Sequence, residues 1–234
     1  MPDQSGRPYV YLAGPDVFFP DVAEHAALLK KTLAERGMIG MFPADNSIDA
    51  AKYPGPKDIG LAIGEANEAL MLKADIIIAN VQPWRGVEAD DGTAYEVGFM
   101  SAQGKIVILH TNDPRPFAKR VAEDYYHGKV HQDGPFTRGD SDNLMIESFP
   151  GFADNLMLVN AATKSQQRIT GTKPDPATVV QPSFEKAADL AKALWEQHTQ
   201  GLKSGFNASA DKKSPAKELI ARVAKKVRAI WPQH

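Results

Sequence analysis

Short apolar runs and stretches with helical spacing alternate along the first half of the chain. The runs are residues 9–13, 38–42, 74–81 and 106–109. Between them, apolar residues recur every three or four positions in residues 21–36 and 57–73, and another helix-length stretch follows Gly92. The run Ile76–Ala79 has no polar alternation, which is typical of a parallel strand covered on both faces. This order predicts an α/β fold: a doubly wound, flavodoxin-like sheet of about five mostly parallel strands flanked by helices.

The second half of the chain has a weaker pattern. Residues 111–155 are rich in Pro, Gly, Asp and Asn, and we interpret them as a long loop that is functional or packs on a neighbour. Residues 155–159 form a short apolar run, residues 160–182 read as a connector, and residues 183–198 predict a helix with Ser183 as its N-cap.

Two domains are predicted: an α/β domain over residues 1–200, and residues 201–234 as a linker followed by a basic amphipathic C-terminal helix. The segment 211–234 carries seven Lys and Arg residues against two acids. We expect this helix to pack on its own or a neighbouring subunit, and the alternative is a weak contact with an acidic partner.

Composition narrows the class of protein. The chain has 234 residues, a net charge of −2, and no cysteine. The small charge predicts no general attraction to nucleic acid or membrane. The lack of cysteine excludes disulfides and cysteine nucleophiles, and it fits a reducing compartment, so a cytoplasmic location is expected. No apolar run approaches the length that spans a bilayer.

Glu96 is the leading candidate for chemistry, and it has two interpretations. The spacing Thr93-Ala94-Tyr95-Glu96 matches a capping box, in which the glutamate only reaches back to the helix start. Alternatively, Glu96 is a nucleophile near a helix N-terminus that Asp90 and Asp91 precede. Under that hypothesis Tyr11, near the end of the first strand, hydrogen-bonds the carboxylate and fixes its rotamer.

Other motifs exclude several chemistries. The turn Gly14-Pro15-Asp16 lacks the glycine spacing of a dinucleotide loop, and the sequence has no phosphate-binding GxxxxGK[ST] stretch. His127 and His131 have the separation of two zinc ligands, but HGKVH lacks the glutamate of HExxH, so we interpret both as solvated loop residues.

Several stretches taken together resemble the nucleoside 2-deoxyribosyltransferase family. They occur in the family's order: YLAGPDVFFPD (11–21), FPADN (42–46), ADIIIANVQPWRG (74–86), DDGTAYEVGFMSAQGK (90–105) and DNLML (154–158). The resemblance implies that Glu96 is the nucleophile, that Tyr11 orients it, and that Asp90 contacts the sugar hydroxyls. It also implies that Asn155 and Met157 reach into a neighbouring subunit's site, and therefore that the protein is a homo-oligomer, a dimer or higher. A second Asn-Leu-Met occurs at 143–145.

The same resemblance places further residues at the substrate: Gly14, Phe18, Asn46, Asn67, Trp84, Arg85 and Gly92. Asn67 falls where many relatives have an aspartate that handles the proton of the base. Trp84 offers a flat face for a heterocycle, and Arg85 orders the loop. No metal or organic cofactor is implied.

The implied reaction is base exchange on a 2′-deoxyribonucleoside, as part of nucleotide salvage. Glu96 attacks C1′, a covalent deoxyribosyl-enzyme forms, and a second base displaces it with net retention. The substrates expected are purine or pyrimidine deoxynucleosides and free bases. Free nucleosides are predicted over 5′-monophosphates, because Asp90 beside the 5′ position would repel phosphate. The alternatives are an N-glycosidase that hydrolyses nucleosides or their 5′-monophosphates, and a non-catalytic nucleotide-binding module.

Overall fold

The computed structural model describes residues 2–204. Five parallel strands form the main sheet in the order β2-β1-β3-β4-β8, so the predicted doubly wound parallel sheet is confirmed. The strands are β1 (Tyr9–Ala13), β2 (Ile39–Met41), β3 (Ile76–Asn80), β4 (Ile106–His110) and β8 (Val180–Gln181). The α-helices are α1 (Val22–Ala34), α2 (Pro56–Lys73), α3 (Asp91–Ala102), α4 (Phe117–Arg120), α5 (Leu156–Thr170), α6 (Pro176–Val179) and α7 (Phe184–Ser204).

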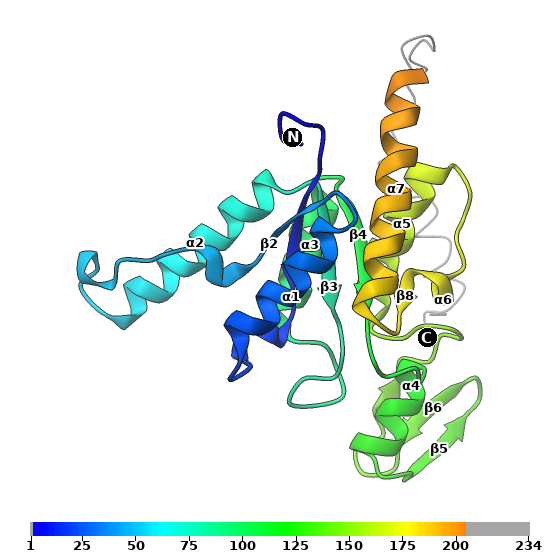
Figure 1. The fold of residues 1–234 in the computed structure, drawn as a ribbon. Coiled ribbons are helices and arrows are strands. Elements are labelled where there is room, and N and C mark those ends of the chain that lie inside the picture. The colour runs from blue at the N-terminus through cyan, green and yellow to red at the C-terminus, as the bar shows by residue number, and fades with distance from the viewer. Residues whose placement is uncertain (1, 205–234) are drawn as a thin grey trace. The chain divides into compact units, whose positions relative to one another are not determined.

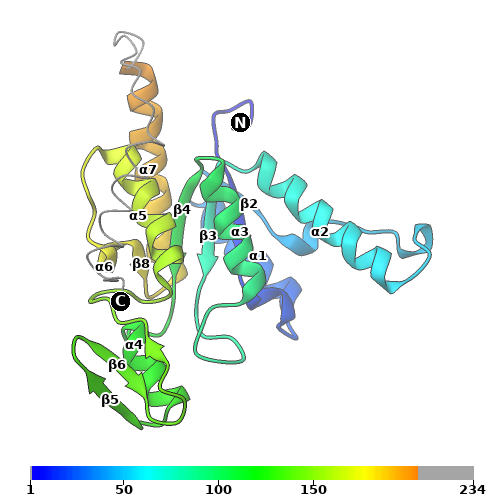
Figure 2. The ribbon, with the colours of Figure 1, turned by 180° about the vertical axis from the view of Figure 1, so that it is seen from behind.

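Helices cover both faces of this sheet. Helices α1 and α7 lie on one face, and α2, α3 and α5 lie on the other (Figures 1 and 2). Strand β1 shows the resulting alternation, since Val10 and Leu12 pack with α1 and α7 while Tyr11 and Ala13 pack on the opposite face. All residues of β3 and β4 are buried, as the continuous apolar runs predicted.

The parallel arrangement brings the carboxyl ends of the strands to one edge. Strand β1 pairs with β3 from Val10 opposite Ile76 to Ala13 opposite Ala79. Two loops therefore leave the sheet side by side, one after Ala13 and one after Asn80. Ligand sites in open α/β sheets form at this edge, and most of the predicted site residues lie in or beside these two loops.

Residues 155–182 differ from the prediction. They form helix α5, the short helix α6 and the edge strand β8, and the connector interpretation of 160–182 was wrong. Helix α5 buries small and polar side chains such as Ala161, Ala162 and Ser165, so its sequence lacks a strong apolar stripe. Its ends follow ordinary rules, because the Asn155 side chain caps the start and Gly171, with φ of 70°, ends it.

Residues 111–155 are not one long loop. They contain α4, a π-helical turn (η4, Val121–Tyr125) and a three-stranded antiparallel sheet of β5 (Val130–Asp133), β6 (Phe136–Gly139) and β7 (Met145–Ile146). This small sheet and α4 lie beyond the carboxyl end of β4 (Figure 1). Within residues 2–204, no helix is long and apolar enough to cross a membrane.

The described residues include only the first part of the predicted C-terminal segment. Helix α7 continues to Ser204, so the linker predicted to begin at residue 201 is helical over its first residues. The basic segment 211–234 lies outside the described residues.

Candidate active site

Glu96 and Tyr11 form the centre of the candidate site. Glu96 lies in the second turn of α3, and Tyr11 lies on β1, on the sheet face that α3 covers. The Tyr11 hydroxyl donates to Oε1 of Glu96 at 2.5 Å. The predicted contact is therefore present, and it joins residues that are 85 positions apart in the sequence.

The capping-box interpretation of Glu96 was wrong. Asp90, not Thr93, is the N-cap of α3, and its Oδ2 accepts from the backbone N of Thr93 at 3.0 Å and from its hydroxyl at 3.2 Å. Helix α3 therefore begins at Asp91, one turn earlier than the capping box requires, and Glu96 points to Tyr11 instead of the helix start. Glycine at position 92 leaves room for the capping carboxylate, because a Cβ there would lie 3.0 Å from Oδ2 of Asp90.

Burial and a neighbouring charge make Glu96 an unusual carboxyl group. Burial raises the pKa of Glu96 to about 7, the hydrogen bond from Tyr11 lowers it, and the charge of Asp90 raises it. Burial also raises the pKa of Tyr11, and the charge of Glu96 adds to that effect, so the phenol stays protonated and remains a donor. A carboxyl group with a pKa near neutrality, held by one neutral donor, suits nucleophilic or acid–base work.

An aromatic pair lies at the carboxyl edge of the sheet. Phe18, at the end of the 3₁₀ helix η1 (Pro15–Phe18), stacks on Trp84 with ring centroids 5.6 Å apart and planes 14° apart. The Arg85 guanidinium lies 5.6 Å from the Phe18 ring centroid and 5.1 Å from that of Trp84. Arg85 has a φ of 53°, an uncommon value for a residue with a side chain. Phe18 is 58% exposed, so the pair forms a flat surface that solvent reaches.

Asn46 and Asn67 lie together, although they come from different elements. Asn46 follows the short 3₁₀ helix η2 (Pro43–Asp45), and Asn67 lies in α2. The side-chain amide of Asn46 donates to Oδ1 of Asn67 at 3.2 Å. Two neutral amides in contact offer hydrogen-bond donors and acceptors, but neither of them supplies a proton as a carboxylic acid does.

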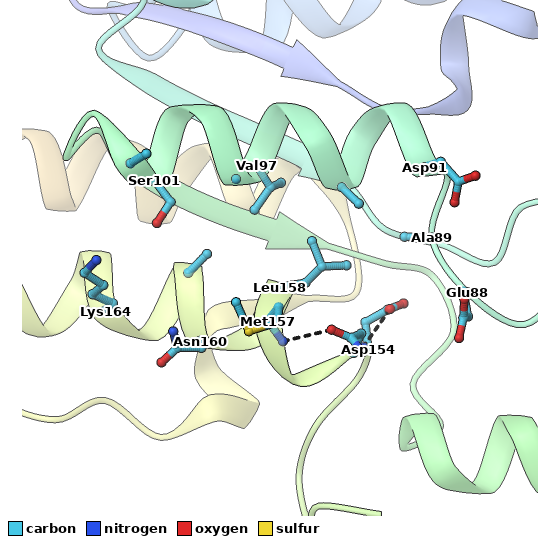
Figure 3. A pocket seen from close by; sticks show the side chains of 15 residues that line it. Glu88, Ala89, Asp91, Val97, Ser101, Asp154, Met157, Leu158, Asn160 and Lys164 are labelled. Atoms are coloured by element: carbon cyan, nitrogen blue, oxygen red, sulfur yellow. Dashed lines mark hydrogen bonds between the residues drawn. The ribbon is translucent and has the colours of Figure 1, made fainter. Parts of the chain in front are cut away.

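Asn155 and Met157 line a cavity that neither Glu96 nor Tyr11 lines within this chain. The cavity, of about 440 Å³, lies between α3 and α5, where α3 contributes small residues such as Ala94 and Gly98 (Figure 3). The Asn155 side chain caps α5 through the backbone N of Met157 at 2.9 Å and donates to Glu147 at 3.0 Å. Met157 is 66% exposed.

A second cavity, of about 660 Å³, lies between the loop that precedes α3 and the small sheet. Trp84, Arg85 and Asp90 line it from the loop, and Tyr125 and Leu144 line it from the other side. Tyr125 and Leu144 were not predicted to lie at the site. They belong to residues 111–155, which show no helical or strand periodicity and were interpreted as a loop.

A buried ion pair holds the loop that precedes α3, and the sequence analysis did not predict this pair. Arg120 and Asp154 are 0% and 1% exposed in their side chains, and Arg120 Nη2 lies 2.9 Å from Asp154 Oδ2. Arg120 also donates to the backbone oxygens of Val87 and Ala153, at 2.7 and 3.1 Å. One side chain therefore joins the loop before α3 to the segment before α5. A lone Arg in a weakly patterned region gives no signal of such a role.

Gly14 lies beside two buried polar residues, Asp16 and Asn80, and Asp16 also contacts the partly exposed His25. Gly14 has a φ of 153°, and a Cβ there would lie 2.4 Å from Asp16 Oδ2 and 2.8 Å from the Asn80 Cβ. The sequence interpretation placed Gly14 at the substrate. The structure gives it a definite local reason, which is the close packing of Asp16 and Asn80 beside it.

Comparison with known proteins identifies the class. Residues 10–157 match the family described as Nucleoside 2-deoxyribosyltransferase. An uncharacterized protein of Schizosaccharomyces pombe is 32% identical over 202 residues, which cover 82% of this chain and 92% of the relative. The chain therefore belongs to the nucleoside 2-deoxyribosyltransferase family, and the resemblance noted from its motifs is confirmed.

A solved structure agrees on the fold. It is described as a 2-desoxiribosyltransferase from Leishmania mexicana, and it matches this protein with a TM-score of 0.54 and 27% sequence identity. The match covers 80% of this chain and 97% of that one.

Proposed function

We propose that this protein is a nucleoside 2-deoxyribosyltransferase that exchanges the base of a 2′-deoxyribonucleoside through a covalent intermediate on Glu96. The observation that carries the proposal is the contact between Tyr11 and Glu96, because it orients a partly buried carboxylate near the start of α3. Helix α3 follows the loop that leaves the carboxyl end of β3, the side of the sheet where such folds bind ligands. Family membership supports the reaction class.

The proposed chemistry has two displacements. Oε1 of Glu96 accepts from Tyr11, so Oε2 is the oxygen that attacks C1′. The C1′–N bond breaks, and its electron pair leaves with the base, which takes a proton from water, because Asn46 and Asn67 supply only hydrogen bonds. A nitrogen of a second base then attacks C1′ from the opposite side, and the bond between C1′ and Oε2 breaks and releases the Glu96 carboxylate. The proton of the attacking nitrogen passes to the hydroxide that the first step left in the solvent. The first displacement requires Glu96 in its ionised form, and the second regenerates that form.

The substrate side of the proposal uses the remaining residues. The Phe18–Trp84 pair stacks on the base, Asp90 binds a sugar hydroxyl, and no cofactor takes part. Three acids, Glu88, Asp90 and Asp91, line the cavity beside the loop, against Arg85. An excess of carboxylates favours a free nucleoside over its 5′-monophosphate. The direct comparison is kcat/KM for deoxyadenosine and deoxyadenosine 5′-monophosphate, and preference for the monophosphate would contradict this part.

We also propose that the active unit is a homo-oligomer whose sites are shared. Met157 is exposed beside Asn155, and helix α2 exposes Leu61, Ile63 and Leu72. Mixing two inactive proteins tests the idea: Glu96→Gln and Asn155→Ser, the latter chosen because Ser still caps a helix. Recovered exchange activity in the mixture supports shared sites, whereas a monomer of full activity would contradict them.

The test of the reaction is base exchange. The protein is incubated with deoxyadenosine and a different free base, with Glu96→Gln as the control. A new deoxynucleoside that forms only with the unchanged protein supports the transferase. Free deoxyribose without a new nucleoside would identify an N-glycosidase, and no product with either protein would favour a non-catalytic binding module. Repeating the assay with all four deoxynucleosides decides between purine and pyrimidine preference.

A further inference from the structure

A buried carboxylate that the proposed reaction does not use holds the turn between β1 and α1. Asp16, in η1, is 6% exposed. Its Oδ2 accepts from the side-chain amide of Asn80 at 3.0 Å, and its Oδ1 lies 2.6 Å from Nε2 of His25, which donates because a carboxylate only accepts. Both oxygens are thus engaged, so Asp16 is placed to hold structure in position and not to attack a substrate.

This carboxylate joins the two loops that carry the aromatic pair. Asp16 precedes Phe18 by two residues within η1. Asn80 ends β3, and its Oδ1 accepts from the backbone N of Gln82 at 3.1 Å, just before Trp84. The bond between Asp16 and Asn80 therefore sets the separation of the loops from which Phe18 and Trp84 extend.

His25, on α1, also contacts the residues that hold these two loops. Its ring lies 5.4 Å from the Phe19 ring, and Phe19 in turn lies 6.5 Å from Trp84. His25 thus contacts both the carboxylate and the aromatic cluster. Gly14 permits the close approach, because any side chain there would collide with Asp16 and Asn80.

We propose that Asp16 is a positioning residue that, through Asn80 and His25, holds Phe18 against Trp84 and so shapes the surface on which a nucleobase stacks. The nucleobase as ligand rests on the proposed function, whereas the geometry of the rings does not. Stacking requires two flat faces at a fixed spacing, and one hydrogen-bonded carboxylate between the loops provides it. Loss of the carboxylate charge removes one acceptor, and the loops then separate.

The ring geometry is tested without any substrate. The chain has three Trp residues, so Trp195→Phe and Trp231→Phe leave Trp84 as the fluorescent reporter. In this background, Asp16→Asn is expected to raise acrylamide quenching of Trp84 at least twofold, as Phe18→Ala does. The two changes together should have no more effect than the larger one alone, because both open the same stack. Asp21→Asn, at an exposed acid of the same turn, is the matched control and should leave quenching unchanged.

A reciprocal exchange gives a sharper readout. Asp16→Asn combined with Asn80→Asp reverses donor and acceptor, so that the amide at position 16 donates to the carboxylate at position 80. The remaining oxygens still accept from His25 and from the backbone N of Gln82. This double variant should restore quenching to near the starting level, an outcome that a general loss of packing would not produce.

Kinetics connect the geometry to function. Asp16→Asn should raise KM for the nucleoside about tenfold, the usual scale for one stacked base, with kcat within about threefold. If the unchanged protein exchanges no bases, the proposed function fails while the quenching result still stands. Unchanged Trp84 quenching and KM in a folded Asp16→Asn protein would overturn the inference. If Asp16→Asn does not fold, His25→Ala, at a partly exposed site, removes one donor and is judged by the same two outcomes.

Discussion

Two regions of this protein each bury a carboxyl group, and they hold it in different ways. Burial raises the pKa of Glu96 to about 7 and that of Asp154 to about 6. Glu96 has one neutral donor, the Tyr11 hydroxyl, and a nearby acid, Asp90. Asp154 accepts from the Arg120 guanidinium and from the backbone N of Asn155. The number and charge of the partners, more than burial itself, separate the carboxyl group proposed for chemistry from the one that holds the fold.

Neutralising Glu96 is expected to have the largest effect. Glu96→Gln keeps the acceptor for Tyr11 but removes the proposed nucleophile, so base exchange should fall by about a thousandfold or more. The measurement is the rate of new nucleoside formation.

The same variant should be more stable than the unchanged protein at pH 8. Between the usual pKa of 4.5 and about 7, the unfolded chain has released the proton of Glu96 while the native protein retains it. The free energy of unfolding therefore falls as pH rises through this window, and Glu96→Gln avoids the loss, by up to about 3 kcal/mol. Urea unfolding at pH 4 and pH 8 measures it. A variant that is no more stable at pH 8 would show that burial of Glu96 costs nothing.

Neutralising Asp154 should have the opposite effect on stability. Asp154→Asn leaves the fully buried Arg120 charge without a counter-ion, and this should destabilise the fold by about 3–5 kcal/mol. The control is Asp154→Asn combined with Arg120→Met, which removes both charges and should recover most of that loss. If Asp154→Asn and Glu96→Gln change stability in the same direction, the contrast between the two carboxyl groups is wrong.

The Tyr11 hydroxyl should set the pH range of activity. Tyr11→Phe removes a hydrogen bond to a carboxylate, worth about 1.5–3 kcal/mol, so the pKa of Glu96 should rise by about one to two units. In the proposed reaction only ionised Glu96 attacks, and about half of it is ionised at pH 7 when its pKa is about 7. Activity at pH 7 should therefore fall by about five- to fiftyfold and recover partly at pH 9. The pH–rate profile checks this. A profile of reduced height with an unshifted acidic limb would mean that Tyr11 acts in another way.

Asp90 should give the smallest effect on the pH profile. Asp90→Asn keeps a competent N-cap for α3 but removes the charge that raises the pKa of Glu96, so the acidic limb should move slightly to lower pH. Asp90→Ala should in addition lose about 1 kcal/mol of stability with the cap. If the acidic limb of the Asp90→Asn pH–rate profile moves to higher pH, the repulsion between Asp90 and Glu96 is contradicted.

The first half of the fold followed from the sequence because its repeats are short and strongly patterned. Four apolar runs and the helical spacing between them predicted β1 to β4 with their helices. Helix α5 was missed because its buried face consists largely of small and polar residues. The small sheet was missed because two of its strands, β5 and β6, have few fully buried side chains and no clear alternation.

The candidate site was also predicted only in part from the sequence. Tyr11 and Glu96 were paired by topology and by family resemblance, and the structure has their contact. Local spacing alone favoured a capping box, because Asp90 and Thr93 are both plausible caps and only the tertiary contact separates them. Asp16 and Asn80 lie within motif stretches, but they contact each other across 64 positions, and Arg120 contacts Asp154, so local spacing does not indicate these contacts.

The most direct test of the central claim is mass spectrometry of the protein after rapid acid quenching with deoxyadenosine and no added acceptor base. Covalent catalysis predicts a peptide that contains Glu96 with the added mass of one deoxyribosyl group, and no such peptide from Glu96→Gln. Base exchange by the unchanged protein with no adduct on Glu96, or wild-type exchange by Glu96→Gln, would contradict the account.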